Sequence, residues 1–197
     1  MQKRPGESAK ATVVEARSFV VDGDLVSGGS VALYCKRPEP GSGQSSDPYC
    51  LELPGGAVRR CEGQPSCNVN LLSPVNCIED LREGVKRSVG KSAAKSLFGA
   101  RDPSYMGSVE DDAGRVEDFV FYNRYFSQIS LKGFPNPVTL RNPRSRFWPI
   151  SEVEMQIGRN PYAVSRHVLP VLATFAPGFG GRIKELRPEL DIPRLAL

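Results

Sequence analysis

The chain has 197 residues, 40% of them hydrophobic, and a formal net charge of +4 at pH 7. Such a length suits one large domain or two small ones around a core of moderate size. No run of about 18 apolar residues occurs, so we expect no transmembrane helix.

Glycine and proline are abundant, with 19 and 17 residues, and they favour turns and short elements over long regular ones. The basic side chains are 18 arginines and 8 lysines. Arginine suits planar contacts with carboxylates, phosphates and aromatic rings. We therefore expect a basic, irregular protein with a surface for binding partners.

The first part of the chain predicts a small β-rich portion. Residues 1–11 are polar and predict a flexible arm, after which the β-branched run from Thr12 to Val21 predicts a strand. The turn Asp22-Gly23-Asp24 and a second run from Ser30 to Cys35 extend this into a hairpin or meander. The cysteine-containing β-rich portion is expected to span residues 12–77, with its hairpins between about 12 and 61.

A second hairpin is expected around the turn Pro54-Gly55-Gly56, between the runs 49–53 and 57–61. It would place Cys50 and Cys61 opposite each other, so these two residues are candidates for a disulfide or a covalent attachment. Disulfide geometry requires Cα atoms less than about 7 Å apart.

All five cysteines lie between residues 35 and 77. Their odd number and the absence of an apolar leader favour reduced thiols and an intracellular or organellar protein over a secreted one. No Cys-x-x-Cys occurs and the chain has one histidine, so we expect no metal site and no cofactor.

Two helices are expected in a helical portion that spans residues 78–131. Apolar residues at helical spacing predict the first helix over about 78–98, although glycines at 84 and 90 weaken it. Glu117 and Asp118 are expected to open a second helix over about 115–130. The fold class predicted is thus α+β.

The remainder, residues 132–197, predicts a long extended tail that is basic and proline-rich. Nine prolines follow Gly133, and apart from a short helix near Pro161 to Leu172 they predict an extended backbone.

The segment from Lys132 to Ile150 is the strongest candidate for partner binding, because it has four basic residues, three large aromatic residues and no acid. Arginine and aromatic side chains are typical anchors of protein interfaces. The candidate partner-binding residues are Arg141, Arg144, Arg146, Phe147 and Trp148. RNA is a less favoured partner, and a structural alternative is that Phe147 and Trp148 cover the protein's own core.

The single histidine, His167, has no nucleophile or orienting group near it in the sequence. We expect a structural histidine, no catalytic residues and no enzymatic activity. The composition favours a non-enzymatic structural or linker subunit that binds protein subunits of a larger complex. The alternatives are an antenna linker with a cysteine-linked chromophore, since phycobilisome linkers are similarly basic and of this size, a ribosomal accessory protein, or a secreted disulfide-stapled binding module.

Overall fold

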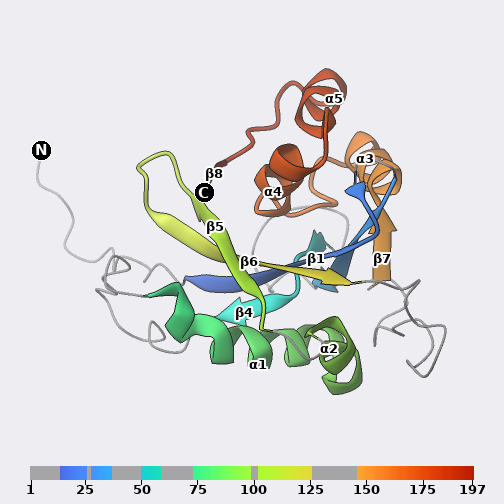
Figure 1. Ribbon diagram of the computed structural model, residues 1–197. Helices are drawn as coiled ribbons and strands as arrows, with labels where there is room; N and C mark the ends of the chain where they lie inside the picture. Colours follow the sequence, from blue (N-terminus) through green and yellow to red (C-terminus); the bar gives the residue numbers. More distant parts are fainter. Residues whose placement is uncertain (1–13, 26–27, 37–49, 59–72, 99–101, 126–145) are drawn as a thin grey trace, which may run out of the picture.

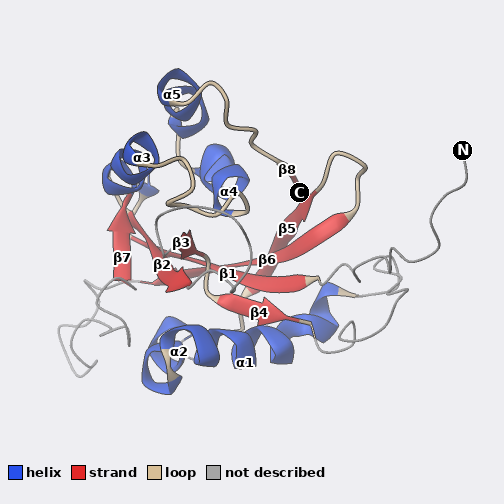
Figure 2. Ribbon diagram, turned by 180° about the vertical axis from the view of Figure 1, so that it is seen from behind, coloured by secondary structure: helices blue, strands red, loops and turns tan. Residues whose placement is uncertain are grey.

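The computed structural model describes residues 14–25, 28–36, 50–58, 73–98, 102–125 and 146–197. They form three layers, with a mixed β-sheet between two groups of helices (Figures 1 and 2). One group consists of α1 (Ile78–Val89), which follows the 3-10 helix η4 (Pro74–Cys77), and α2 (Lys91–Phe98). The other consists of α3 (Ile150–Arg159), α4 (Val168–Phe175) and α5 (Phe179–Leu186).

The described strands are β1 (Glu15–Asp22), β2 (Ser30–Lys36), β3 (Cys50–Glu52), β4 (Gly55–Ala57), β5 (Ser104–Glu110), β6 (Val116–Tyr125), β7 (Arg146–Pro149) and β8 (Arg194–Ala196). Six of them follow the order β3-β2-β1-β6-β5-β8, while β4 also pairs with β1 and β7 with β2. β1 and β6 run parallel, and the other strand pairs are antiparallel.

The strand β1 lies inside the sheet and is buried on both faces, as its apolar run Phe-Val-Val suggests. Because side chains alternate along a strand, Phe19 and Val21 pack in the core beneath α3, α4 and α5. Ala16 and Val20 pack in the second core, beneath α1 and α2. The sheet therefore separates two hydrophobic cores.

The expected helix over 78–98 is two helices, α1 and α2, with Gly90 between them at φ +92°. Side chains disfavour this backbone conformation, so a glycine at the break is physically appropriate.

The prediction of a helix over about 115–130 is wrong, because residues 116–125 form strand β6. The run Phe-Val-Phe-Tyr is rich in β-forming residues and lies between β1 and β5. The acids Glu117 and Asp118, expected at a helix N-terminus, are instead held by basic side chains on the α4 side of the sheet.

The prediction of a long extended tail over 132–197 is also wrong. Its described part forms β7, α3, α4, α5 and β8. Five of the described prolines lie next to a helix or in its first turn, namely Pro149, which also ends β7, and Pro161, Pro170, Pro177 and Pro188. Proline is tolerated at these places because few intrahelical N–H bonds are lost there.

The expected small hairpin portion over about 12–61 is corrected as well. β1 and β2 are antiparallel neighbours, but only over the partners Val21↔Val31 and Asp22↔Ser30. β3 pairs with β2 whereas β4 pairs with β1, so the turn Pro54-Gly55-Gly56 moves the chain between strands and does not close a hairpin. These strands are part of the eight-stranded sheet.

Candidate ligand-binding site

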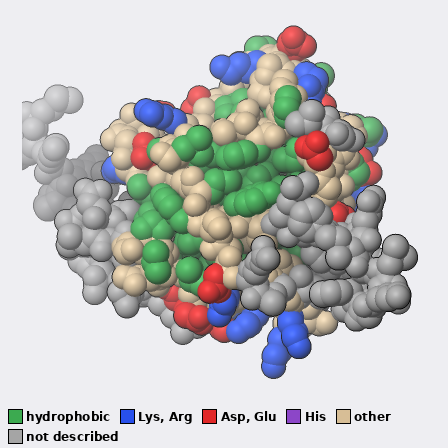
Figure 3. Space-filling model, in the orientation of Figure 1, with side chains coloured by type: hydrophobic (Ala, Val, Ile, Leu, Met, Phe, Trp, Pro, Cys, Tyr) green, Lys and Arg blue, Asp and Glu red, His purple; other side chains and the backbone are tan. Residues whose placement is uncertain are grey.

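Side chains from three neighbouring strands, β1, β6 and β5, form one row across a face of the sheet. Phe19 on β1 is the register partner of Tyr122 on β6, and Tyr122 is the partner of Ser104 on β5. Register partners point to the same face of a sheet, and here this is the face that α4 covers. On this face, hydrophobic side chains gather between the C-terminal helices and the sheet, with charged side chains around them (Figure 3).

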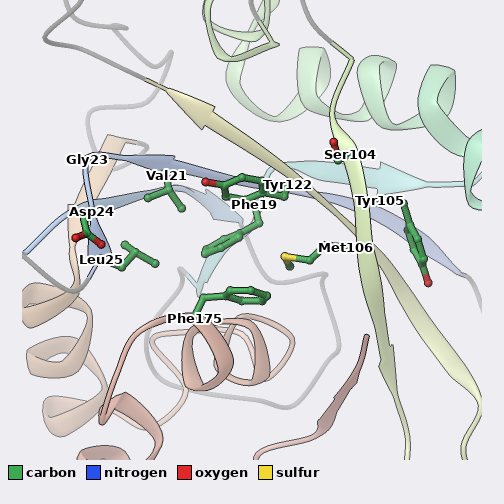
Figure 4. Close-up of a pocket in the computed structure, with 10 residues that line it drawn as sticks. All are labelled: Phe19, Val21, Gly23, Asp24, Leu25, Ser104, Tyr105, Met106, Tyr122 and Phe175. Carbon is green, nitrogen blue, oxygen red and sulfur yellow. The ribbon is translucent and has the colours of Figure 1, made fainter.

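A bulge in β5 adds a further side chain to this surface. Tyr105 pairs with Phe121 and Gly107 with Val120, so Met106 is an extra residue between two successive pairs. Bulges of this kind redirect a side chain locally. Met106 is half-buried and lies beside Phe19 and Phe175 (Figure 4).

These residues line a pocket of about 460 Å³. Its walls come from β1, the turn after β1, the start of β5, strand β6 and the end of α4 (Figure 4). The lining residues are Phe19, Val21, Gly23, Asp24, Leu25, Ser104, Tyr105, Met106, Tyr122 and Phe175. The lining of the pocket is therefore mainly apolar, and its polar groups are one carboxylate and several hydroxyls.

Three aromatic rings of the pocket lie close together. The centroid of the Phe19 ring is 6.0 Å from that of Tyr122 and 5.7 Å from that of Phe175, at interplanar angles of 45° and 39°. Phe19 is buried, whereas Tyr122 and Phe175 are half-buried. The ring of Tyr105 belongs to the other face, where it contacts Phe119 and Phe121 edge-on.

A buried charge cluster lies farther along the same face of β1 and β6. Arg17 is 2% exposed, and its guanidinium is 2.6 Å from Glu52 and 3.5 Å from Asp118. It also pairs with Glu15 and donates to the Leu53 carbonyl at 3.3 Å. Burial lowers the pKa of Arg17, but the charges of Asp118 and Glu52 raise it, and the net pKa is raised.

His167, at the start of α4, joins this cluster. Its Nδ1 lies 2.5 Å from Oδ2 of the buried Asp118, and its Nε2 lies 3.4 Å from Glu117. Arg166 also pairs with Glu117 and approaches His167 Nε2 at 3.3 Å. The sequence places Asp118 49 residues from His167, and a helical prediction for that region gave no reason to connect them.

The charge cluster and the pocket lie at opposite ends of α4, since His167 precedes its first residue and Phe175 is its last. Eight residues of helix span about 12 Å. His167 is not among the residues that line the pocket. The pocket is thus the candidate site, and the charge cluster anchors α4 to the sheet.

Of the predicted partner-binding residues, Arg146, Phe147 and Trp148 belong to β7, which pairs with β2. Trp148 is 8% exposed and packs in the core beneath α3 and α4. Arg146 is exposed, pairs with Glu152 at 2.5 Å and lies 4.3 Å from the Trp148 ring centroid. The candidates Arg141 and Arg144 lie outside the described residues.

Cys50 is half-buried on β3, while Cys61 lies outside the described residues, so their proximity stays a prediction. Across the described ranges, no three His, Cys, Asp or Glu side chains are grouped so as to hold a metal ion. The described helices include none with the length and apolar character needed to cross a membrane.

No family model matches the sequence, and a search of curated proteins found no match. Among solved structures, the chain is similar to a Nudix hydrolase from Alicyclobacillus acidocaldarius, with a TM-score of 0.50 and 13% identity over 93% of this chain and 99% of that one. At this identity the likeness shows a Nudix-like fold.

Two further solved structures are similar at lower scores. The C-terminal domain of mouse MUTYH, in complex with human PCNA, has a TM-score of 0.41 and 17% identity over 90% of both chains. DR0079, a hypothetical Nudix protein from D. radiodurans, has a TM-score of 0.34 and 13% identity over 95% of this chain and 86% of that one.

The prediction of a non-enzymatic structural or linker subunit is wrong. It depended on a long extended tail, and that tail is part of a layered domain whose fold matches that of a hydrolase. The prediction that the chain is not an enzyme is wrong for the same reason.

Proposed function

We propose that this protein binds a small molecule carrying an aromatic ring or another flat apolar group, in the pocket between the sheet and α4. The observation that supports this most is the pocket itself, of about 460 Å³, with the rings of Phe19, Tyr122 and Phe175 in its lining. Ligand sites are typically clefts of roughly 300–1,000 Å³ lined by apolar and aromatic side chains with few polar groups.

The polar groups of the lining would orient the ligand. Asp24 lies in the exposed turn after β1, and Ser104 is exposed at the start of β5. Together with the Tyr122 hydroxyl they supply hydrogen-bonding groups, while the rings exclude water from the apolar part of the ligand. A ligand with one polar and one aromatic end suits this arrangement.

Hydrolysis of the bound molecule is the second candidate function, and the similarity of the fold to a Nudix hydrolase supports it. A fold does not determine an activity, so this candidate also needs a reactive group in the site. The Asp24 carboxylate is the lining group best suited to accept a proton from water. His167 is remote from the pocket and is not proposed for this role.

Binding is tested by adding aromatic fragments to isotope-labelled protein and following its NMR spectra. We expect shifts in the signals of Phe19, Met106, Tyr122 and Phe175, and weaker binding in Phe175→Ala. Tyr162→Ala is the matched control, because Tyr162 is an aromatic residue that is 61% exposed and lies outside the pocket lining. Fragment binding that Phe175→Ala leaves unchanged would contradict the proposal.

Hydrolysis is tested by incubating each fragment-derived ester, amide and phosphoester with the protein and measuring product. We expect Asp24→Asn to remove turnover while binding persists, because the amide cannot accept a proton from water. Asp112→Asn is the control, since Asp112 is also exposed but lies in the turn between β5 and β6. Turnover that survives in Asp24→Asn would exclude this role for Asp24.

A protein partner at the segment that ends in β7 also remains a proposal, with RNA as the alternative. It is supported by Arg146 of β7, whose exposed side chain lies against the ring of Trp148. Arg146→Ala should weaken partner binding without unfolding the chain, because this ion pair is exposed and contributes roughly 1 kcal/mol or less to stability.

A further inference from the structure

We infer that the edge of β5 at residues 104–106 binds an extended peptide segment of a partner protein, and that an aromatic side chain of this segment enters the pocket. The inference rests on the proposed function, because it takes the pocket as a site for an aromatic group and names a peptide as the source of that group. Three features carry it: an open stretch of sheet edge, the pocket beside that stretch, and apolar surface on both faces of the edge.

The strand β5 is paired from its first residue on the β6 side but not on the β8 side. Its pairing with β6 begins at Ser104, whereas its pairing with β8 begins at Ser108. Within the part of the chain that the structure describes, no strand pairs with residues 104–106 on the β8 side. Met106, the bulge residue, has no register partner on β6 either. Unpaired N–H and C=O groups along a strand edge are a template for another strand.

The open stretch is as long as strands that the sheet already contains. β3, β4 and β8 each have three residues, so a ladder over residues 104–106 matches pairings found within this fold. The end of β8 passes directly across Gly107, where a Cβ atom would collide with the Ala196 carbonyl oxygen. An added strand would therefore lie in line with β8 along the same edge of β5.

The side chains of the open stretch permit such pairing. Residues 104–107 have the sequence Ser-Tyr-Met-Gly and include no charged residue. Charged side chains on an edge strand are a common protection against pairing with another chain. This protection is missing here.

The pocket lies beside the same stretch, since Ser104, Tyr105 and Met106 all belong to its lining. Met106 projects from β5 toward the space beside Phe19 and Phe175 (Figure 4). In β-strand addition, main-chain hydrogen bonds provide affinity and pockets for alternate side chains provide specificity. A side chain of the added strand on the α4 face would lie next to Met106 and enter the pocket.

The opposite face of this edge also exposes apolar surface. Tyr105 is 44% exposed, and its ring contacts Phe119 and Phe121 edge-on. Because side chains alternate along a strand, the neighbours of the inserted aromatic residue would contact Tyr105. A ligand bound wholly on the α4 face would lie across the sheet from this ring.

The pocket favours a peptide over a second copy of this chain as the added strand. Pairing of β5 with β5 of a second copy would bring Ser104 and Met106 to the α4 face, and neither has an aromatic ring. A partner segment with an aromatic residue between β-forming neighbours satisfies the edge and the pocket together.

Two ligands with the same ring test the inference by calorimetry. One is the capped pentapeptide Thr-Val-Phe-Val-Thr, and the other is N-acetylphenylalanine amide, which carries the ring without a strand. We expect the pentapeptide to bind at least about tenfold more tightly, because it adds main-chain hydrogen bonds to the same ring. It should also slow hydrogen exchange of backbone amides within residues 104–106, which the smaller ligand should leave unchanged.

Methylation of the pentapeptide backbone identifies strand pairing. Successive residues of a strand direct their N–H and C=O groups to opposite sides. Methylation of both valine nitrogens and methylation of the phenylalanine and final threonine nitrogens should therefore differ in effect. One of these peptides should bind at least about tenfold more weakly than the parent and the other nearly as well. Equal effects would contradict strand addition.

Tyr105→Ser should weaken binding of the pentapeptide and leave binding of N-acetylphenylalanine amide unchanged, which also shows that the variant is folded. Tyr162→Ser is the matched control, because Tyr162 is 61% exposed and lies outside the pocket lining. This control should change the affinity of neither ligand. A Tyr105→Ser protein with full affinity for the pentapeptide would contradict contact on both faces of the edge.

The two levels of the proposal fail in different ways. Equal affinities for the two ligands, or pairing of residues 104–106 with a second copy of the chain in place of the pentapeptide, would overturn the edge inference and leave the pocket as a site for aromatic groups. Absence of NMR shifts at Phe19, Tyr122 and Phe175 with both ligands and with the aromatic fragments would overturn the proposed function as well.

Discussion

Gly84 of α1 lies directly against Gly56 of β4: a Cβ atom at Gly84 would stand 2.5 Å from the Gly56 nitrogen and 2.6 Å from the Gly55 carbonyl carbon. The missing side chains let the helix approach the sheet more closely than larger residues would allow. One turn later, Ser88 donates a hydrogen bond to the Gly55 carbonyl at 2.9 Å. α1 is therefore fixed to β4 by backbone contact.

Gly84→Ala should destabilise the protein by roughly 1–3 kcal/mol, since the added methyl group meets immobile backbone. Gly181→Ala is the control, because Gly181 lies in α5 with open space around its Cβ position. That variant should gain about 0.5–1 kcal/mol from helix propensity. Urea unfolding of both variants measures the difference, and a Gly84→Ala protein as stable as wild type would contradict this packing.

Arg17→Met should destabilise the fold by about 3–5 kcal/mol, because it leaves the carboxylates of Glu52 and Asp118 buried without their cation. Arg82→Met is the matched change at an exposed pair with Asp102 and should cost about 1 kcal/mol or less. Chemical denaturation of the two variants tests this. Similar losses in both would show that the cluster around Arg17 is not a stabilising network.

Trp148→Ala should destabilise the chain by about 3–5 kcal/mol, since a nearly buried aromatic side chain leaves a cavity when it is removed. Tyr162→Ala, at an exposed aromatic residue, should change the free energy of unfolding little. The melting temperatures of both variants provide the measurement. A Trp148→Ala protein with unchanged melting and lost partner binding would favour an interface role for Trp148.

Stability above pH 10 should depend on Tyr34. Burial raises the pKa of Tyr34, and the negative charge of Glu52 raises it further. A raised pKa in the folded state stabilises the fold below the unfolded pKa of about 10, and this contribution is lost as the pH rises through the folded pKa. The free energy of unfolding should therefore fall faster in wild type than in Tyr34→Phe. Parallel curves from urea titrations would contradict this.

Local patterns predicted the elements whose structure depends mainly on neighbouring residues. The β-branched run before Asp22 coincides with strand β1. The apolar residues at helical spacing after Cys77 coincide with helices α1 and α2. Residues 116–125 carry apolar residues at spacings compatible with a helix, but position between β1 and β5 makes them a strand. The β-forming side chains of the run Phe-Val-Phe-Tyr agree with the strand that this position imposes.

The candidate site could not be predicted from local patterns, because its lining comes from several separate segments. The row Phe19, Tyr122 and Ser104 depends on strand register, which the sequence leaves open until the strand order is known. The prediction of an extended tail from the prolines of the C-terminal part is wrong for a related reason. They indicate helix ends as well as extended chain, and only packing distinguishes the two.

The most direct test of a ligand site between the sheet and α4 is a search for intermolecular NOEs between the labelled protein and the aromatic fragments that bind to it. The account predicts contacts from the ring protons of a bound fragment to the rings of Phe19, Tyr122 and Phe175 and to the methyl group of Met106. NOEs confined to other surfaces, or none at saturating ligand, would contradict the proposed function.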